Sequence, residues 1–405
     1  MPRKPKVAIV GAGIGGLTAA IAMHRRNVDV VVYEQSPQIA EIGAGVSLSP
    51  NAIKAVRALG LDEEIAAIGF ESDNQIVRAW DTGDILSKVF RKGVYQKEFG
   101  APYLSVHRAD LVEVLRQQLP DNVIHLDARC TEVETGDNGA RACFAGGEKV
   151  EADLVVGADG IRSVVRQSLF GRDAPRFTGS VCWRGLVPLD AFPPGLISTD
   201  LTLYMGPRSH VIHFMVRRGT LINFVAHVET DSWTQESWTQ ECERSEVMET
   251  FAGWHEPLLR LLGSSDRYYK WALYDRDPLE SWSKGRVTLL GDAAHAMLPH
   301  IGQGACMAIE DGYVLADLVS QHPDNLNEAL RLYERLRVPR TRRAVLEARA
   351  RGKEMHLTSR WAQIKRNVRM ALQHRLGGDK TGLKLSEFYD YDVAAASRSA
   401  SPRVS

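Results

Sequence analysis

The first predicted strand ends in a glycine-rich turn that opens a helix. A short apolar run at residues 7–10 is followed by Gly11, Gly13 and Gly16, and a helical pattern continues from Leu17. In the spacing Gly-x-Gly-x-x-Gly, the first glycine permits a tight turn and the second lets the backbone approach a pyrophosphate, while the third lets the helix pack closely on the strand. The helix start adds free N–H groups and the positive end of a dipole. The sequence therefore predicts a binding site for the phosphates of an adenine dinucleotide.

An acidic residue follows the second predicted strand. Residues 28–33 are mostly apolar, and Glu34 comes 18 residues after Gly16. A carboxylate at this place can hydrogen-bond a ribose 2′-OH. A tight turn without a ligand would explain the glycines but not the acid. FAD or NAD fits the pattern, whereas the free carboxylate disfavours a cofactor with a 2′-phosphate.

The overall composition excludes several classes of function. Of the 405 residues, 50 are Lys or Arg and 50 are Asp or Glu, so no net charge favours nucleic acid or an anionic membrane surface. The five cysteines have no spacing typical of a metal site, and we expect reduced thiols in a cytoplasmic protein. The N-terminus runs directly into the first strand, which leaves no room for a signal peptide, and no apolar run is long enough to span a membrane.

A second buried strand ends in Gly157-Ala-Asp159-Gly160. Asp159 fits the cap of the helix that follows, but its pairing with the first glycine turn favours a ligand-facing role. Arg108 stands at the start of another predicted helix, near Asp110. It fits either a surface ion pair or a contact with a phosphate or ribose, and the sequence leaves both interpretations open.

A third buried strand ends in Gly291-Asp292. In the segment after Pro299, small residues up to Gly304 would let the backbone lie against a planar ring. The helix that begins near Ala305 would point its N-terminus at that ring, and the positive end of its dipole favours negative charge there.

The middle of the chain, from about residue 177 to 271, consists of short β-rich runs separated by turns. We therefore expect an α/β fold with a Rossmann-like dinucleotide-binding domain, an inserted β-rich substrate domain and C-terminal helices. The expected boundaries are 1–75, 101–175 and 276–325 for the first domain, 76–100 and 176–275 for the second, and 326–390 for the helical region. Within the last region we expect one long Arg-rich helix, at about 326–373, with an exposed basic face. Residues 391–405 are expected to be a disordered tail.

The three glycine-containing strand ends, taken in order, resemble those of the FAD-dependent class A aromatic hydroxylases, the para-hydroxybenzoate hydroxylase-like flavoprotein monooxygenases. The resemblance covers about residues 5–390. It implies that NADH or NADPH reduces a bound FAD, and that one atom of O₂ passes to a phenolic ring through a flavin C4a-hydroperoxide. Since a second Gly-x-Gly-x-x-Gly is absent from the sequence, we expect NAD(P)H to bind only transiently.

The resemblance also implies which residues bind FAD. The ADP part would contact the glycine turn and Glu34, the flavin side would contact Arg108, and the ribityl and pyrophosphate would contact Asp292. Asp159 would serve both FAD and NAD(P)H. The complete set of implied cofactor residues is Gly11, Gly13, Gly16, Glu34, Arg108, Asp159, Asp292, Gly302, Gly304 and Ala305, with Pro299 also beside the isoalloxazine.

Within this family, the segments at 42–52, 182–185 and 295–300 are most similar to salicylate 1-hydroxylases. The resemblance therefore implies conversion of salicylate to catechol with loss of CO₂. The alternatives are 3-hydroxybenzoate 6-hydroxylase and 6-hydroxynicotinate 3-monooxygenase, although the latter carries histidine where this chain has Ser47. A FAD-fold binding protein without catalysis is an alternative of a different class. We expect a monomer or homodimer without nucleic-acid partners.

The hydroxylation requires a base that deprotonates the phenol, because a phenolate is the better nucleophile. The resemblance places a substrate-side histidine or tyrosine in the strand that contains His210 and His213, and we favour His213 over His210. Strand alternation puts these two side chains on opposite faces, so at most one should face the substrate. The residues expected to contact the substrate are Ser47, Arg184, Phe214 and Pro299, of which Arg184 could pair with a carboxylate.

Overall fold

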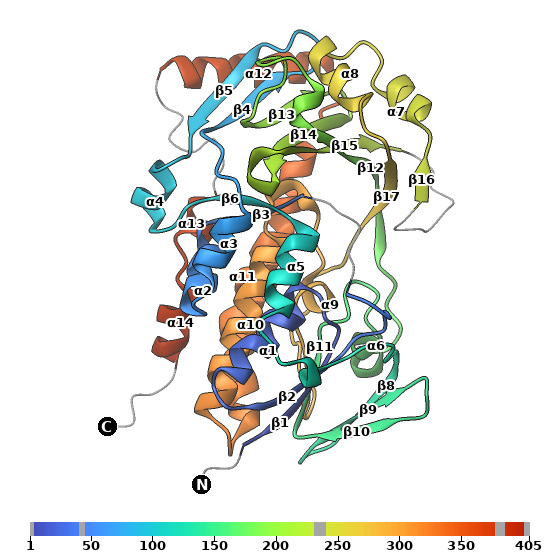
Figure 1. The fold of residues 1–405 in the computed structure, drawn as a ribbon, viewed down its shortest axis with the longest axis vertical. Helices are drawn as coiled ribbons and strands as arrows, with labels where there is room; N and C mark the ends of the chain where they lie inside the picture. The colour runs from blue at the N-terminus through green and yellow to red at the C-terminus, as the bar shows by residue number, and fades with distance from the viewer. Residues whose placement is uncertain (1–3, 40–44, 231–239, 377–384, 401–405) are drawn as a thin grey trace.

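The fold is taken from a computed structural model that describes residues 4–39, 45–230, 240–376 and 385–400. A parallel sheet lies at the end of the molecule near the N-terminus, and a larger, mostly antiparallel sheet lies at the other end, with long helices running between them (Figure 1). The predicted α/β class, with a Rossmann-like sheet, a β-rich sheet and C-terminal helices, is confirmed. The domain boundaries stay a prediction.

The parallel sheet carries the glycine turn. Its strands, in spatial order, are β18 (Val287–Leu289), β11 (Leu154–Gly157), β1 (Lys6–Val10), β2 (Asp29–Tyr33) and β7 (Ile124–His125). Val10 at the end of β1 lies opposite Gly157 at the end of β11, and Gly157 lies opposite Leu289 of β18. The three strand ends singled out in the sequence therefore meet at one edge of the sheet, where ligands bind in such folds.

Two helices pack against each other beside this sheet, α1 (Ile14–His24) and α10 (Gly304–Gln321). A Cβ on Gly312 of α10 would lie 2.7 Å from the backbone nitrogen of Ala19 in α1, so the missing side chain lets the helices approach closely. Because α1 begins at the glycine turn and α10 begins near the third strand end, their packing holds both helix starts near the same edge.

The larger sheet has eight strands and a buried hydrophobic core on one side. The strands, in spatial order, are β16 (Gln240–Cys242), β17 (Tyr268–Asp275), β12 (Arg176–Pro188), β15 (Leu221–Glu229), β14 (Ser209–Val216), β13 (Leu201–Gly206), β4 (Asn74–Ala79) and β5 (Ile85–Phe90). Neighbours pair antiparallel except β13 and β4, which pair in parallel.

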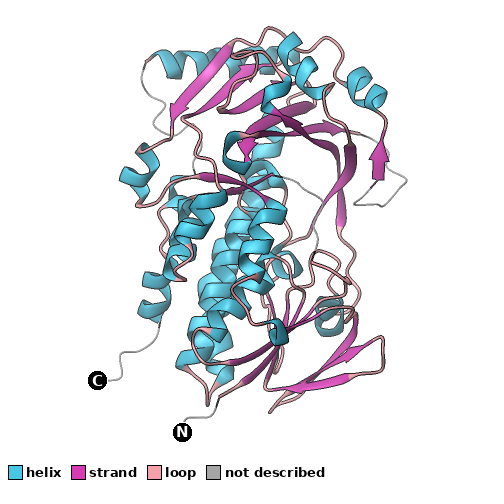
Figure 2. Cartoon of the chain, viewed as in Figure 1, coloured by secondary structure: helices cyan, strands magenta, loops and turns pink. Residues whose placement is uncertain are grey.

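Two smaller sheets complete the strands. One consists of β3 (Gly45–Leu48) and β6 (Leu104–His107), and the other of β8 (Cys130–Thr135), β9 (Ala140–Phe144) and β10 (Lys149–Ala152). The shorter helices are α2 (Pro50–Ala58), α3 (Asp62–Ile68), α4 (Val94–Phe99), α5 (Arg108–Arg116), α6 (Val164–Phe170), α7 (Arg244–Thr250), α8 (Glu256–Leu262) and α9 (Asp292–His295). Figure 2 shows helices both beside the two sheets and in the region between them.

The C-terminal region differs from the sequence prediction in two respects. The predicted single helix is two helices, α11 (Leu326–Met355) and α12 (Arg360–Arg375), because Ser359 accepts a hydrogen bond from the Ala362 N–H and caps a new helix start. The basic face of α11 is also not uniformly exposed, since Arg337 is fully buried.

The predicted disordered tail is wrong for residues 391–400. After α13 (Ser386–Tyr389), the chain forms α14 (Val393–Ala400), which packs against α2, α10 and α11. Val393 is completely buried in this contact. The Ala/Ser-rich composition of the segment did not indicate that one apolar side chain would hold it against the other helices. Residues 401–405 lie outside the described residues. Among the described helices, none combines the length and apolar character that a membrane crossing requires.

Candidate active site

A single cavity of about 430 Å³ runs from the glycine turn of the parallel sheet to one face of the eight-stranded sheet. All three strand ends reach it: Gly13 after β1, Ala158 and Gly160 after β11, and Gly291 and Asp292 after β18. The site therefore has a dinucleotide end on the parallel sheet and a second end on the larger sheet.

The glycine turn leaves space for a phosphate. Gly11 has φ +106°, and a Cβ on it would lie 2.4 Å from the Ala158 carbonyl oxygen, so this position requires glycine for the turn itself. At Gly13, by contrast, an added Cβ would meet no atom within 4 Å. Gly13 is also the N-cap of α1 and has no side chain to cap the N–H groups of the first turn, and Gly13, Ile14 and Gly15 line the cavity. This arrangement fits a pyrophosphate.

Glu34 lies directly after β2 and contacts the glycine turn. Its carboxylate accepts hydrogen bonds from the Ala12 N–H at 2.8 Å and from the Ser36 N–H at 2.9 Å. The side chain is thus held beside the turn, with lone pairs left over for a ribose hydroxyl.

Arg108 and Asp292 both line the cavity between its two ends. Burial lowers the pKa of Arg108, and attraction to Asp292 offsets this only in part. Asp110, the residue considered as a surface partner for Arg108, instead forms a bidentate ion pair with Arg217. Both N···O distances between Arg217 and Asp110 are 2.9 Å. The placement of Arg108 in the cavity wall is consistent with a contact to a phosphate or ribose.

The start of α10 forms the next part of the wall. Pro299, Gly302, Gly304 and Ala305 all line the cavity, as the sequence predicted for residues beside a planar ring. Gly302 has φ +63°, and the N-cap Gln303 gives α10 no side-chain hydrogen bond. The unpaired N–H groups and positive dipole end of this 18-residue helix can stabilise negative charge on a ring that lies here.

A buried ion network fixes the start of α10. Glu310 and Asp311 of α10 both pair with Arg337 of α11, at 2.5 and 2.7 Å, and Arg340 pairs with Glu310 at 2.8 Å. Burial alone would raise the pKa of both acids, but the arginines outweigh it and hold both pKa values below normal.

The same network reaches the third strand end. Asp311 accepts a hydrogen bond from the Gly291 N–H at 3.1 Å, and its Oδ2 lies 2.5 Å from His295 Nε2. The Asn51 amide of α2 donates to Glu310 at 2.6 Å. His295 is therefore a buried structural residue, and α2, α9, α10 and α11 are tied together behind the cofactor wall.

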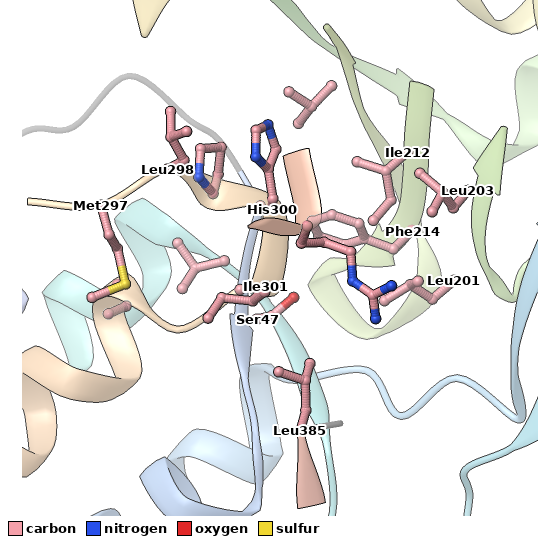
Figure 3. A pocket seen from close by; sticks show the side chains of 18 of the residues that line it. Ser47, Leu201, Leu203, Ile212, Phe214, Met297, Leu298, His300, Ile301 and Leu385 are labelled. Atoms are coloured by element: carbon pink, nitrogen blue, oxygen red, sulfur yellow. The ribbon is translucent and has the colours of Figure 1, made fainter. Parts of the chain in front are cut away.

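One face of the larger sheet forms the far wall of the cavity. Every second residue of several neighbouring strands points into it, as strand geometry requires. The lining residues from this sheet are Ser87 and Val89 of β5, Gln75 and Val77 of β4, Leu201, Leu203 and Met205 of β13, His210, Ile212 and Phe214 of β14, Val225 and His227 of β15, and Arg184 of β12. In Figure 3, Leu201, Leu203, Ile212 and Phe214 gather on one side and Met297 and Leu298 on the other, with His300 and Ser47 between them.

The prediction that His213 faces the substrate is wrong. His210 and Phe214 line the cavity, so alternation directs His213 to the opposite face of β14, where it is buried beside the Tyr204 ring. Burial, with Arg78 nearby, lowers the pKa of His213 to about 3. His210, which the sequence ranked second, is the histidine of this strand that can meet a ligand.

The Asp159 side chain caps a helix in the structure, and its predicted role towards FAD and NAD(P)H stays a prediction. Its carboxylate accepts hydrogen bonds from the Ser163 hydroxyl at 2.5 Å and from the N–H groups of Val164 and Val165 at 2.7 and 3.1 Å. These bonds cap α6, which was the alternative interpretation. Only the neighbouring residues Ala158 and Gly160 reach the cavity.

Sequence reasoning missed Arg91, which follows β5 and lines the cavity. The residue is only 3% exposed, and its guanidinium lies 4.0 Å from the centre of the Tyr103 ring. One nitrogen donates to Gln75 at 2.5 Å, but Nε and Nη1 have no partner within the described residues. The signal was the alternation of Ser87, Val89 and Arg91 on one strand face. A buried cation with unused N–H groups is costly unless a ligand pairs with it.

The remaining predicted substrate residues also line the cavity. Arg184 places its guanidinium 3.9 Å from the centre of the Trp271 ring, with its Nε unpartnered among the described residues. Ser47 lies close to Gly302, where an added Cβ would be 3.6 Å from the Ser47 Cβ. Residues 42–44 of the segment that resembles salicylate hydroxylases lie outside the described residues.

Comparisons with known proteins agree with this geometry. A family model described as FAD binding domain matches residues 4–348. The 3-amino-4-hydroxybenzoate 2-monooxygenase PtnB3 of Streptomyces platensis is 38% identical over 373 residues, which cover 92% of this chain and 94% of that protein. The 6-hydroxynicotinate 3-monooxygenase of Pseudomonas fluorescens is 36% identical and covers 84% and 89%. A solved salicylate hydroxylase substrate complex superimposes with a TM-score of 0.82 at 27% identity, covering 99% of each chain.

Proposed function

From the premise that this chain belongs to the FAD binding domain family and is an FAD-dependent aromatic-ring monooxygenase, we propose that it hydroxylates a small phenolic aromatic acid. The alternative of a FAD-fold protein without catalysis does not hold, because the relatives with 38% and 36% identity are monooxygenases. The observation that carries the proposal is one continuous cavity that joins the glycine turn to a wall containing the buried Arg91, two of whose nitrogens make no hydrogen bond within the described residues.

We assign the cofactor to the part of the cavity between the parallel sheet and α10. The glycine turn and Glu34 would hold the adenosine diphosphate part, Arg108 and Asp292 the middle, and the backbone at Gly302–Ala305 the ring system. When bound, FAD supplies the hydride acceptance from NAD(P)H and the O₂ activation that no side chain provides. The protein's own contribution is to orient the ring system with the α10 N-terminus and to exclude water with the apolar residues of the larger sheet.

We assign the substrate carboxylate to Arg91. Its Nε and Nη1 have hydrogen-bond capacity that nothing in the described residues uses, and the guanidinium fork matches a carboxylate. Arg184, the sequence-based candidate, is stacked on Trp271 and is the second choice.

We propose that the phenolic hydroxyl of the substrate lies beside His210. Its Nδ1 is hydrogen-bonded to His356, and its other ring nitrogen, Nε2, makes no hydrogen bond within the described residues. A neutral imidazole with a free nitrogen at the cavity surface can accept a phenolic proton. The adjacent apolar wall of Leu203, Ile212 and Phe214 would hold the ring.

The substrate that we favour is a 3-amino-4-hydroxybenzoate-like acid, hydroxylated without loss of CO₂. This choice rests on the 38% identity and nearly complete coverage of PtnB3. The second candidate is salicylate, which the sequence favoured and the 0.82 TM-score of the salicylate hydroxylase complex supports. The two reactions differ in CO₂ release.

The test is NAD(P)H oxidation by the FAD-loaded protein across aminohydroxybenzoates, hydroxybenzoates, hydroxynicotinates and the benzoates that lack a hydroxyl group. We expect an accelerated oxidation with 3-amino-4-hydroxybenzoate, formation of a hydroxylated product, little H₂O₂ and no CO₂. CO₂ released stoichiometrically from salicylate would favour the second candidate. If no phenolic acid accelerates NAD(P)H oxidation, the substrate assignment is overturned.

A further inference from the structure

Four histidines from distant parts of the chain gather at one end of the cavity. His210 lies on β14, His227 on β15, His300 in the short 3₁₀ turn Pro299–Ile301, and His356 directly after α11. The rings of His210 and His227 are stacked at 4.2 Å between centroids, and the ring of His210 is 5.5 Å from that of His300 and 4.9 Å from that of His356. The first three line the cavity, and His356 lies behind them.

One hydrogen bond and one close nitrogen–oxygen contact lead from this cluster to the surface. Nδ1 of His210 lies 2.6 Å from Nε2 of His356, and Nδ1 of His356 lies 3.3 Å from Oε1 of Glu229, at the end of β15. The His356 side chain is 2% exposed, whereas the Glu229 side chain is 31% exposed. The path therefore begins at a cavity-lining imidazole and ends at a carboxylate in contact with solvent.

We propose that His210, His356 and Glu229 form a proton relay that carries the phenolic proton of the bound substrate to solvent. The proposal rests on the proposed function, since it needs a phenolic ligand beside His210. His210 is the group that touches the substrate, and His356 and Glu229 act through it.

The relay solves a difficulty that a single buried base would face. Burial, together with His227, His356 and His300, lowers the pKa of His210 well below its usual value, and burial with Arg366 nearby lowers the pKa of His356 to about 4. A buried imidazolium is therefore unfavourable at either position. A proton held on His210 alone would return to the phenolate.

Concerted transfer avoids that charged intermediate. The phenolic O–H bond breaks as an N–H bond forms at His210 Nε2. The Nδ1–H of His210 passes to Nε2 of His356, and the Nδ1–H of His356 passes to the Glu229 carboxylate, which releases its proton to water. Both imidazoles stay neutral and end in the opposite tautomer, and the phenolate is the only new charge in the cavity. The return of the tautomers completes the cycle after the product leaves.

The geometry favours this path over a metal site. Nitrogens of His210, His300 and His356 lie within 4.8 Å of one another, close enough to raise the question of a metal ion. Two nitrogens at about 2.0–2.1 Å from a tetrahedral zinc ion would be about 3.3 Å apart. The 2.6 Å between His210 and His356 is shorter than that and is the length of a strong hydrogen bond.

The neighbouring charged groups are consistent with an outward path. Arg208 pairs with Glu229 at 3.3 Å and keeps a positive charge at the outer end. Arg366 of α12 faces His356 and disfavours a proton resting there, and Arg184 acts in the same way on His227. His300 donates Nδ1–H to the Ala348 carbonyl at 3.2 Å, so it stands beside the path without joining it.

The experiment follows proton release when 3-amino-4-hydroxybenzoate or 4-hydroxybenzoate binds to the FAD-loaded enzyme without NAD(P)H. Stopped-flow absorbance reports phenolate formation, and a pH indicator reports the proton that reaches solvent. The variants are Glu229→Gln and His356→Gln, which keep hydrogen-bonding groups but do not relay a proton in this way. The control is Glu256→Gln, which removes an exposed carboxylate paired with Arg260 on α8, away from the cavity.

We expect both relay variants to bind the ligand within about threefold of wild type and to slow proton release by about 10-fold or more, a part of what a positioned base contributes. Their phenolate formation should also move to higher pH, and the control should match wild type. Unchanged proton release and an unchanged pH profile in Glu229→Gln would overturn the relay, even if His356→Gln fails to fold. If the wild-type enzyme binds no phenolic acid, the proposed function fails and the relay fails with it.

Discussion

Arg91 shows how a single buried charge can indicate a ligand. Its guanidinium is almost fully buried, yet two of its nitrogens have no partner in the described part of the chain. We expect Arg91→Met to weaken binding of the carboxylate substrate about 10- to 100-fold, which corresponds to the loss of a charge-assisted hydrogen bond. Binding of the matching carboxamide should change little. The measurement is the dissociation constant of each ligand from changes in flavin absorbance.

The matched control is Arg184→Met. Arg184 is also a cavity-lining cation, but its guanidinium is stacked on Trp271. We expect a smaller loss for the carboxylate in this variant. A larger loss than in Arg91→Met would assign the carboxylate to Arg184, as the sequence had suggested, and would contradict the role of Arg91.

At the same scale, the sequence identified residue types better than side-chain directions. Alternation along β14 correctly separated His210 from His213, but it could not say which face meets the cavity, because that depends on contacts with segments more than 80 residues away in sequence. Asp159 is a similar case. Its position after a buried strand was recognised, but the competition between a ligand and the α6 N–H groups is decided by local geometry. Arg91 was missed because the alternation of Ser87, Val89 and Arg91 places it on one strand face but does not show that this face meets the cavity.

At the scale of elements, the glycine turn separates a folding role from a binding role. We expect Gly11→Ala to destabilise the protein itself, because the residue has a positive φ and an added Cβ would lie 2.4 Å from a carbonyl oxygen. Gly13→Ala should leave the stability of the apoprotein nearly unchanged, because its backbone is extended and the added Cβ meets open space. The same Cβ should lower FAD affinity by about 10-fold or more, since the second glycine permits the pyrophosphate to approach.

Thermal unfolding of the apoprotein and flavin-fluorescence titration measure the two effects separately. A Gly13→Ala variant with wild-type FAD affinity would show that the pyrophosphate does not lie over this turn. This element was predictable from the sequence because strand, turn and helix are contiguous. The break between α11 and α12 was not, since the helical pattern of the sequence continues across it, whereas in the structure α11 ends at Met355 and Ser359 caps the start of α12.

At the scale of the whole molecule, the buried ion network links elements that no local pattern connects. Arg337 of α11 is fully buried between Glu310 and Asp311 of α10. We expect Arg337→Met to cost about 3–5 kcal/mol of unfolding free energy, because it leaves two buried carboxylates without their main partner. Denaturant unfolding measures the loss, and FAD binding should weaken as well, since Asp311 also holds the Gly291 N–H.

The control for the network is Arg331→Met on the same helix. Arg331 pairs with Glu328 on the surface, and such exposed pairs contribute about 0–1 kcal/mol. An equal effect of the two substitutions would contradict the structural importance of the network. The sequence analysis predicted an exposed basic face for this helix. The Glu and Leu residues between the arginines of α11 do not show which of its turns pack against α10.

The histidine cluster makes the whole molecule sensitive to mild acid. Burial lowers the pKa of His300 and of His356 to about 4, whereas both titrate near 6.5 in the unfolded chain. Between these values the unfolded state binds more protons, so the stability that is present above pH 6.5 is lost as the pH falls towards 4. Each residue should contribute up to about 2 kcal/mol of loss at pH 5 relative to pH 7.

The lowered pKa values of Glu310 and Asp311 act in the same direction but only below about pH 4, where normal carboxylates take up protons. Urea unfolding at intervals from pH 7 to pH 4.5 therefore isolates the histidines. The stability should decline steeply across this range in the wild-type protein and less steeply in His300→Gln, which removes one of the groups. A stability that is constant from pH 7 to pH 5 would mean that these imidazoles are not buried in solution as they are in the structure.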